Sequence, residues 1–186
     1  DGSTTFDTVS YTASTFPISG GAAMILNTGS LDSTSNDTAS NWCISSNVFG
    51  DGDFGTPGSA NDGCSTVADI SVGDLVITEI MWDPTTVADY RGEWIEIYNA
   101  SSGSLNLNGL QINSTGNAGH TVSGDLVVAS GGQVLLNVRS TTSVNGGTTG
   151  DYTYSYSEVN FGKTDSVSLV AGATTVDSVT YTFAGF

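Results

Sequence analysis

Three glutamates near the middle of the chain have the residue type and spacing for acid–base chemistry: Glu79, Glu93 and Glu96. Hydrolysis of a glycosidic bond needs two carboxyl groups roughly 5–10 Å apart across a sugar-binding cleft. An extended strand over 93–98 places Glu93 and Glu96 on opposite faces, because side chains alternate along a strand. Nothing else in the sequence indicates a cleft. We therefore expect these glutamates to accept hydrogen bonds from loop N–H groups such as those of GTPG (55–58), and we predict no enzymatic activity.

An acidic loop with the sequence GDGDFGTPGSAND is the candidate for a metal site, because it contains Asp51, Asp53 and Asp62. Calcium takes roughly six to eight oxygen ligands in proteins. The spacing departs from the EF-hand pattern, since no Glu stands at the twelfth position counted from Asp51. Asp-Gly pairs also form turns without any metal. We expect no cofactor, and calcium at these aspartates is the weaker alternative.

The single histidine, His120, is a candidate for a Ser-His-Asp triad. It lies in the Gly-rich stretch NAGHTVSGD, which lacks the strained strand-to-helix turn of a nucleophile elbow. Serine is so common in this chain that its spacing from His120 carries no information. We therefore expect His120 to have no catalytic role.

Cys43 and Cys64 are the only cysteines, and they do not form a CxxC pair. With one histidine in the chain, they cannot supply the four N or S ligands of a tetrahedral metal site. A disulfide that closes a loop of about 20 residues is the better interpretation, and such a closure contributes about 3 kcal/mol. Because disulfides persist in oxidising compartments, we expect an extracellular or cell-surface protein.

The charge balance excludes several classes of partner. The chain has 19 acidic residues and three basic ones, Arg91, Arg139 and Lys163, for a net charge of −16. Phosphate recognition needs clustered Lys and Arg, so we expect no nucleic-acid partner. No run approaches the roughly 20 apolar residues of a membrane helix, so we expect no membrane insertion. N-glycosylation sequons occur at Asn36, Asn99 and Asn113. Glycans are therefore a further candidate partner.

Short β-branched and aromatic runs recur along the chain, separated by turn residues, and helical periodicity is almost absent. This pattern predicts an all-β protein, an antiparallel β-sandwich of immunoglobulin-like type. Over 93–98 neither face is plainly polar, so we expect this strand in the middle of a sheet. The predicted strands are 5–11, 23–26, 75–82, 93–98, 105–112, 126–128, 133–138, 152–156, 166–170 and 176–181.

The two ends of the chain repeat one another. Residues 171–186 align without a gap to residues 1–16, and eight of the sixteen pairs are identical. The offset is 170 residues, so the chain contains one period of a repeat plus a repeated strand. The chain also begins without Met, and we expect a processed piece or a window of a longer protein.

Three stretches in the second half of the chain resemble a known family: DLVITEIMWDP (74–84), GEWIEIYNAS (92–101) and LNLNGLQI (105–112). In this order they are similar to the opening half of a bacterial lamin-tail domain. That family begins with an INEI-like strand, continues with an EWIELYN-like strand, and then has a dLsGw-like strand. The resemblance implies an immunoglobulin-like sandwich with no catalytic activity of its own and a structural or attachment role.

The later elements of that family occur in two places. VDSVTY (176–181) and FDTVSY (6–11) both match one late strand, and only the second is followed by GGAAMIL (20–26), NWC (41–43) and FGTPGSAND (54–62). The order is thus permuted, and the Arg expected after the AAMIL strand is missing. The resemblance implies three segments: a closing half over 1–64, a linker over 65–74, and the opening half of the next domain over 75–186.

The proposed linker is too short to let the two halves close on each other easily. Ten extended residues reach at most about 33–36 Å, close to the roughly 27–34 Å between the poles of a sandwich before any detour. We predict that the sandwich is completed head to tail between repeats or subunits. The chain would then be a structural subunit or repeat of an extracellular fibre or surface assembly, with copies of itself as partners. The alternative is an adhesive or anchoring accessory module of a larger secreted protein. The expected assembly residues are Thr5, Phe6, Val9, Tyr11, Val176, Val179 and Tyr181.

Overall fold

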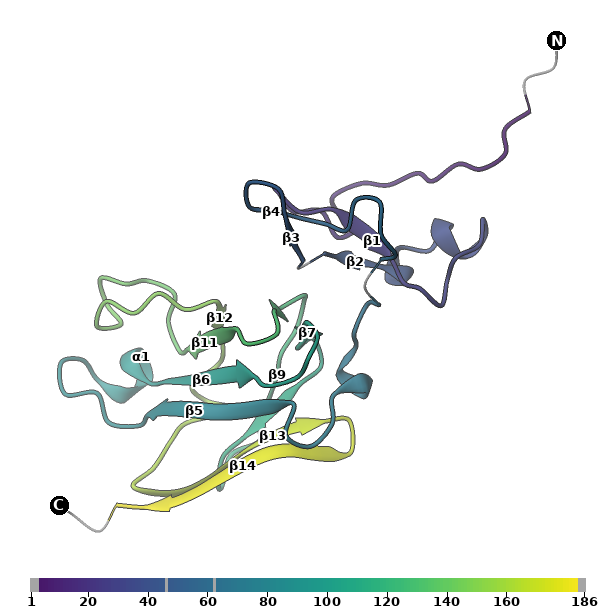
Figure 1. Ribbon diagram of the computed structural model, residues 1–186. Helices are drawn as coiled ribbons and strands as arrows, with labels where there is room; N and C mark the ends of the chain where they lie inside the picture. Colours follow the sequence, from purple (N-terminus) through teal and green to yellow (C-terminus); the bar gives the residue numbers. More distant parts are fainter. Residues whose placement is uncertain (1–3, 46, 62, 184–186) are drawn as a thin grey trace. The chain divides into compact units, whose positions relative to one another are not determined.

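The computed structural model describes residues 4–45, 47–61 and 63–183. The chain divides into two compact units, Asp1–Cys64 (unit 1) and Ser65–Phe186 (unit 2). Within the described residues, the secondary structure consists of fourteen β-strands, three 3-10 helices and one four-residue α-helix (Figure 1). The prediction of an all-β protein is confirmed. In these ranges, no helix has the length and apolar character needed to span a membrane.

The first sheet of unit 2 has the strand order β12-β11-β6-β5. Its strands are β5 (Leu75–Met81), β6 (Trp94–Asn99), β11 (Gln133–Asn137) and β12 (Tyr152–Thr153). Because β6 pairs antiparallel with β5 on one side and β11 on the other, the prediction of a central strand over 93–98 is confirmed. Ile95 and Ile97 of β6 are fully buried, whereas Trp94 and Tyr98 are half-buried on the opposite face.

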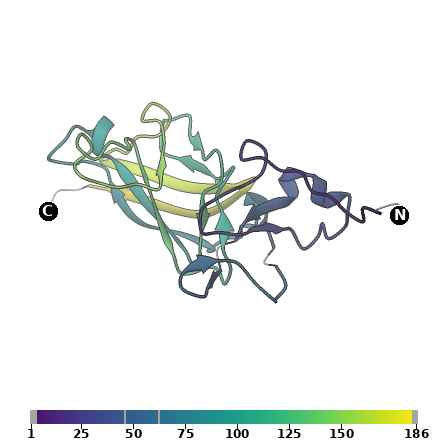
Figure 2. The same ribbon diagram turned by 90° about the horizontal axis from the view of Figure 1, so that it is seen from above.

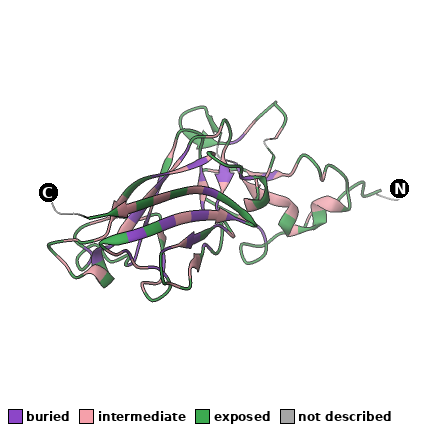
Figure 3. Cartoon of the chain, turned by 90° about the horizontal axis from the view of Figure 1, so that it is seen from below, coloured by how far each residue is buried: buried purple, intermediate pink, exposed green. Residues whose placement is uncertain are grey.

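The second sheet of unit 2 has the order β14-β13-β8-β9. Its strands are β8 (Gln111–Asn113), β9 (His120–Thr121), β13 (Thr164–Ala171) and β14 (Thr174–Thr182). β13 and β14 form a hairpin and run side by side (Figure 2). Buried and more exposed residues alternate along β13, as expected for a strand with one face on the core (Figure 3). The two sheets form an immunoglobulin-like sandwich within unit 2, so the predicted fold class is confirmed, whereas residues 75–186 were expected to be only the opening half of such a sandwich.

The run 105–112, which we predicted as one strand, is broken in two. Gly109 adopts a φ of +91°, a conformation that residues with a side chain rarely adopt, and this turns the chain. The first piece, β7 (Leu105–Asn106), pairs with β10 (Val127–Val128) in a two-stranded ribbon of its own. Only the second piece, β8, joins the second large sheet.

The apolar core of unit 2 collects side chains from both large sheets. Its largest fully buried side chains include Leu75, Ile95, Ile97, Leu110, Leu136 and Leu169. Burial of each such side chain contributes roughly 1.5–3 kcal/mol. The segment 65–74, which we expected as a linker, contains the 3-10 helix η3 (Val67–Asp69) and then Ile70, which is buried in this same core. This segment therefore lies within unit 2.

Unit 1 is built from two short antiparallel ribbons. They are β1 (Met24–Leu26) with β2 (Trp42–Ile44), and β3 (Val48–Phe49) with β4 (Asp53–Phe54), and the 3-10 helices η1 (Ser35–Asp37) and η2 (Ala39–Asn41) lie between β1 and β2 in the chain. A disulfide joins Cys43 to Cys64, with their Cα atoms 5.7 Å apart, so the predicted bridge is confirmed. Of the large apolar side chains described in this unit, only Phe16 and Ile25 are buried. Unit 1 thus has a small core.

The predicted strand over 5–11 is the main departure from expectation. Residues 4–12 have no strand or helix assignment, and the side chain of Phe6 is 92% exposed. The related sequence at the other end of the chain forms β14, where Val176 is 2% exposed. A strand needs a neighbour to satisfy its backbone N–H and C=O groups, and β14 has β13 whereas 4–12 has no strand partner among the described residues.

Candidate functional site

Glu93 is a carboxylic acid enclosed in the core of unit 2. It follows the helical turn α1 (Asp89–Gly92), directly precedes β6, and is 0% exposed. Its Oε2 accepts a hydrogen bond from the backbone N–H of Phe161 at 3.0 Å, whereas its Oε1 has no hydrogen-bond partner among the described residues. Burial raises the pKa of Glu93 to about 8, opposed by the Phe161 N–H and reinforced by the charges of Asp89 and Asp165. This carboxyl group is therefore largely protonated at neutral pH.

Asp165 also accepts hydrogen bonds from the loop that contains Phe161 and Gly162. Its Oδ1 accepts the backbone N–H groups of Thr115 and Ser166, each at 2.7 Å, and its Oδ2 accepts that of Gly162 at 3.1 Å. Together with Glu93, it fixes the loop that leads into β13. The expectation that Glu93 accepts a hydrogen bond from a loop N–H group is confirmed, and the loop is the one at Phe161.

A buried tyrosine, Tyr154, and a half-buried one, Tyr181, lie in the electrostatic neighbourhood of these acids. Burial raises the pKa of Tyr154, and the charge of Glu93 raises it further. Burial likewise raises the pKa of Tyr181 to about 12, with further contributions from Asp165 and Glu93. Neither tyrosine hydroxyl has a hydrogen-bond partner among the described residues. Their surroundings therefore favour the neutral forms of Glu93, Tyr154 and Tyr181 over the charged forms.

The three glutamates do not form a two-carboxylate site. Glu96 lies on the face of β6 opposite to Ile95, and its Oε1 accepts hydrogen bonds from Thr78 Oγ1 at 2.7 Å and Gln133 Nε2 at 2.8 Å. Glu79 is exposed on β5. Because Glu93 is enclosed while Glu96 faces the other way, these groups cannot act on one bond from opposite sides.

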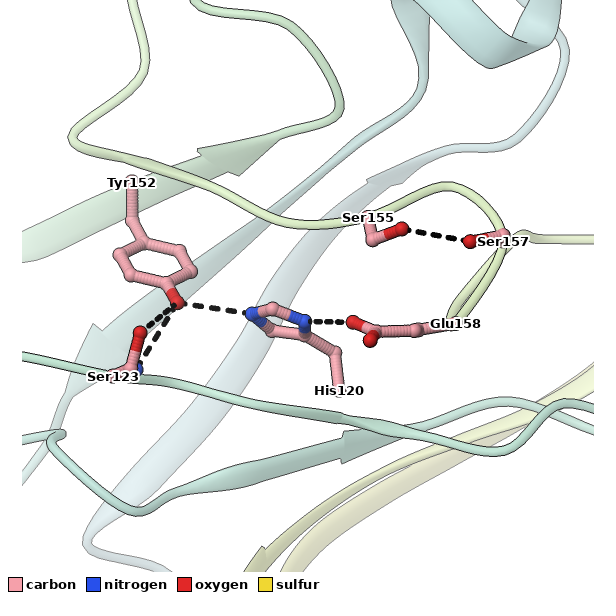
Figure 4. Close-up of polar contacts among 6 residues, drawn as sticks. All are labelled: His120, Ser123, Tyr152, Ser155, Ser157 and Glu158. Atoms are coloured by element: carbon pink, nitrogen blue, oxygen red, sulfur yellow. Dashed lines mark hydrogen bonds and ion pairs between the residues drawn. The ribbon is translucent and has the colours of Figure 1, made fainter.

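His120 is the centre of a polar cluster that joins the two sheets (Figure 4). Its Nδ1 lies 2.6 Å from Glu158 Oε2, and its Nε2 lies 3.0 Å from the hydroxyl oxygen of Tyr152. That oxygen also accepts the backbone N–H of Ser123 at 3.0 Å. Since His120 is on β9 and Tyr152 on β12, the cluster links an edge strand of one sheet to an edge strand of the other.

This cluster is not a serine triad. Both ring nitrogens of His120 already face partners, a carboxylate and a phenol. The nearby hydroxyls of Ser155 and Ser157 bond to each other at 2.8 Å (Figure 4). Sequence reasoning missed Glu158 and Tyr152 as partners, because they lie 38 and 32 residues from His120 and only the closure of the sandwich brings them together.

The aspartate loop of unit 1 has the geometry of a turn. Asp51 and Asp53 are exposed in the hairpin between β3 and β4, where Gly50 and Gly52 adopt φ values of 56° and 117°. Asp62 lies outside the described residues. Across the described ranges, no group of three or more His, Cys, Asp or Glu side chains is placed to hold a metal ion. Turn formation accounts for the spacing of Asp51 and Asp53.

The sequons differ in how accessible their asparagines are. Asn99 is fully buried, and its Nδ2 donates to the carbonyl oxygens of Gly103 at 2.8 Å and Val128 at 2.9 Å. A glycan on this nitrogen would replace one of its two N–H donors and would find no room at a fully buried side chain. Asn36 and Asn113 are half-buried.

Of the four edge strands of the two large sheets, the longest are β5 and β14, and these two lie beside each other. β5 ends the first sheet and β14 ends the second. The two run in the same direction, since Gly73 N–H donates to Val176 O at 3.1 Å, Asp177 Oδ2 accepts Ile77 N–H at 2.7 Å, and further along the rings of Trp82 and Phe183 lie 5.6 Å apart. We call this surface the β5–β14 edge. Its half-buried apolar side chains, which pack on the core, are Ile80, Trp82, Val179 and Tyr181.

Comparison with known proteins agrees with this architecture. A family model described as Lamin Tail Domain matches residues 69–183, a range that contains both four-stranded sheets. The comparison with curated proteins gave no match.

Proposed function

Because the chain belongs to the lamin tail domain family, we propose that it is a structural subunit or repeat of an extracellular fibre or surface assembly whose units join head to tail. The immunoglobulin-like lamin tail domain is a non-catalytic domain type, and membership of the family supports a structural or interaction module in general. The fibre, the head-to-tail contact and the identity of the partner as a further copy are the specific content of the proposal.

The observation that carries the proposal is the repeat between the two ends of the chain. The two similar stretches are offset by 170 residues in a chain of 186. In the C-terminal stretch this sequence forms β14, paired with β13, while the similar N-terminal stretch has no strand partner among the described residues. A segment that has the sequence of a strand and no strand partner among the described residues is suited to pairing with another copy.

The exposed apolar surface of unit 1 supports the same proposal. Its large exposed apolar side chains among the described residues are Phe6, Tyr11, Ile18, Leu31, Val48, Phe49 and Phe54. Among the described residues of unit 1, two large apolar side chains are buried, Phe16 and Ile25. Covering a large apolar side chain contributes roughly 1.5–3 kcal/mol, so contact with another copy would stabilise this unit substantially.

One feature supports an extracellular place for the assembly, and another predicts how salt affects it. The Cys43–Cys64 disulfide is stable in an oxidising compartment. The net charge of −16 keeps separate copies apart at low ionic strength, so that assembly is expected to strengthen as salt screens the repulsion.

The test is the association state of the purified chain at rising protein and salt concentration, followed by sedimentation velocity and negative-stain electron microscopy. We expect linear oligomers that lengthen with salt. Phe6→Asp should shorten them, while Ser33→Asp, which adds the same charge at an exposed polar position of unit 1, should not. A chain that stays monomeric at all concentrations would overturn the fibre proposal and favour an adhesive or anchoring module of a larger secreted protein.

A further inference from the structure

We propose that the loops at one end of unit 2 bind unit 1 of a second copy, and that the β3–β4 hairpin supplies the acidic part of that contact. We call this end of unit 2 the loop pole. It consists of residues 82–93, 138–150 and 154–163 together with Phe183. These two surfaces specify the head-to-tail contact, so this inference rests on the proposed function.

The segments of the loop pole are held together by strand pairing and by contacts between loops. β6 pairs antiparallel with both β5 and β11, so the end of β5, the start of β6 and the end of β11 lie together. Glu93 accepts the Phe161 N–H at 3.0 Å, which joins the loop before β6 to the loop before β13. The Phe183 N–H donates to Lys163 O at 2.7 Å, and its ring lies 5.6 Å from that of Trp82. Accordingly, β5 and β14 end on the side of unit 2 where α1 lies (Figure 1).

All three basic residues of the chain lie at the loop pole: Arg91, Arg139 and Lys163. Each is exposed, and none forms an ion pair with a carboxylate within the described residues. Four acids share the pole, but Glu93 is largely protonated at neutral pH and Glu158 contacts His120, which leaves Asp83 and Asp89. Outside the pole the chain has fifteen acids and no base. An acidic partner is therefore repelled less at the loop pole than elsewhere on the chain.

The loop pole also exposes apolar side chains. Of the four large apolar side chains that are exposed in the described part of unit 2, three lie at this pole: Tyr90, Val144 and Phe183. The Arg91 guanidinium carbon lies 5.2 Å from the centroid of the Tyr90 ring, and the Tyr156 ring lies edge-on to Tyr90 at 6.4 Å. Arginine and aromatic side chains are enriched in protein–protein interfaces, so this composition suits a protein partner.

The β3–β4 hairpin of unit 1 is complementary to the loop pole in charge and in apolar character. All four residues of β3 and β4 are exposed, and three of them are large and apolar: Val48, Phe49 and Phe54. The hairpin also exposes Asp51 and Asp53. Unit 1 as a whole has seven acids and no base. Complementary charge favours the loop pole as the place where this hairpin binds, because the rest of unit 2 has acids only.

The position of the loop pole suits contacts that follow one another along a fibre. The chain enters unit 2 through 65–74, and β5 begins at the end of unit 2 opposite to the loop pole. The pole of each copy is therefore at the end away from the connection to unit 1. A contact between this pole and unit 1 of a second copy is heterologous and can be repeated by further copies.

Charge reversal of the hairpin separates this contact from the general repulsion between copies. Asp51→Lys with Asp53→Lys lowers the net negative charge of the full-length chain, so net charge alone predicts stronger association. We expect association at least about tenfold weaker, because the introduced charges would face the bases of the pole. The measurement is sedimentation velocity at a salt concentration where wild-type chains form oligomers. Asp37→Lys with Glu79→Lys, the same charge change at exposed positions outside both surfaces, should associate no more weakly than wild type.

A charge swap tests whether the two surfaces meet. Arg139→Glu with Lys163→Glu makes the pole acidic and should also weaken association at least about tenfold. An equal mixture of this chain and the hairpin variant should assemble again, because the acidic pole of one meets the basic hairpin of the other. If the mixture stays dissociated, or the hairpin variant behaves like its control, this inference fails and the fibre proposal stands. If wild-type chains do not assemble at any salt concentration, both fail.

Discussion

Replacing Glu93 by Gln should remove a large pH dependence from the stability of unit 2. Glu93 binds its proton more tightly in the folded chain, since burial raises its pKa from 4.5 to about 8. A group whose pKa is raised on folding stabilises the fold fully below its unfolded pKa, and this contribution is lost as pH rises through the folded value. Unit 2 should therefore lose stability between about pH 4.5 and pH 8 through this one group.

The magnitude follows from the size of the shift. A change from 4.5 to about 8, at about 1.4 kcal/mol for each pH unit, gives a loss on the order of 5 kcal/mol. Gln keeps an oxygen that can accept the Phe161 N–H, and it cannot ionise. We expect Glu93→Gln to be close to wild type in stability near pH 5 and several kcal/mol more stable at pH 9.

The assay is chemical denaturation from pH 5 to pH 9, followed by the fluorescence of Trp82 and Trp94, which lie in unit 2. Glu79→Gln is the matched control, because it makes the same chemical change at an exposed position on β5. The difference in unfolding free energy between Glu93→Gln and the control should grow with pH. If the unfolding free energies of Glu93→Gln and Glu79→Gln differ by the same amount at every pH from 5 to 9, the reasoning is refuted.

Three further predictions concern the disulfide, a packed glycine and the histidine cluster. Replacing Cys43 and Cys64 by Ser should cost unit 1 about 3 kcal/mol, detected as earlier unfolding of Trp42 fluorescence, while the unfolding of unit 2 stays unchanged. Gly92→Ala should destabilise unit 2 by about 1–3 kcal/mol, because its Cβ would meet the side chains of Val87 and Pro84, whereas Gly103→Ala has nothing within 4 Å and should be nearly neutral in thermal unfolding. Tyr152→Phe should cost about 1–3 kcal/mol in the same measurement, since the His120 ring and the Ser123 N–H lose their common partner; an unchanged melting temperature would show that the cluster does not stabilise the sandwich.

Local sequence patterns predicted the structure correctly where the outcome depends on the residues of one short segment. The apolar residues on both faces of 93–98 indicated a central strand, and β6 is one. Two cysteines without other metal ligands indicated a bridge, and Cys43 is bonded to Cys64. The motifs at 74–84 and 92–101 indicated the family, whose model matches 69–183.

Local patterns failed where the outcome depends on a distant partner. The segment 5–11 has the sequence of a strand, yet it forms none, because pairing requires a second strand. The run 105–112 is interrupted by a turn at Gly109 that residue preference alone did not indicate. Residue 70 was placed in a linker, although it lies in the core of unit 2.

The sequence by itself determined the β class, the bridge, the family and the similarity between residues 1–16 and 171–186, because each depends on residue type, periodicity or spacing along the chain. Only the tertiary structure decided what surrounds each polar group. Burial against the loop at Phe161 turned Glu93 into an acid that stays protonated at neutral pH. Closure of the two sheets brought Glu158 and Tyr152 to His120. Local solvation and long-range contact are properties of the folded chain, and no short stretch of sequence contains them.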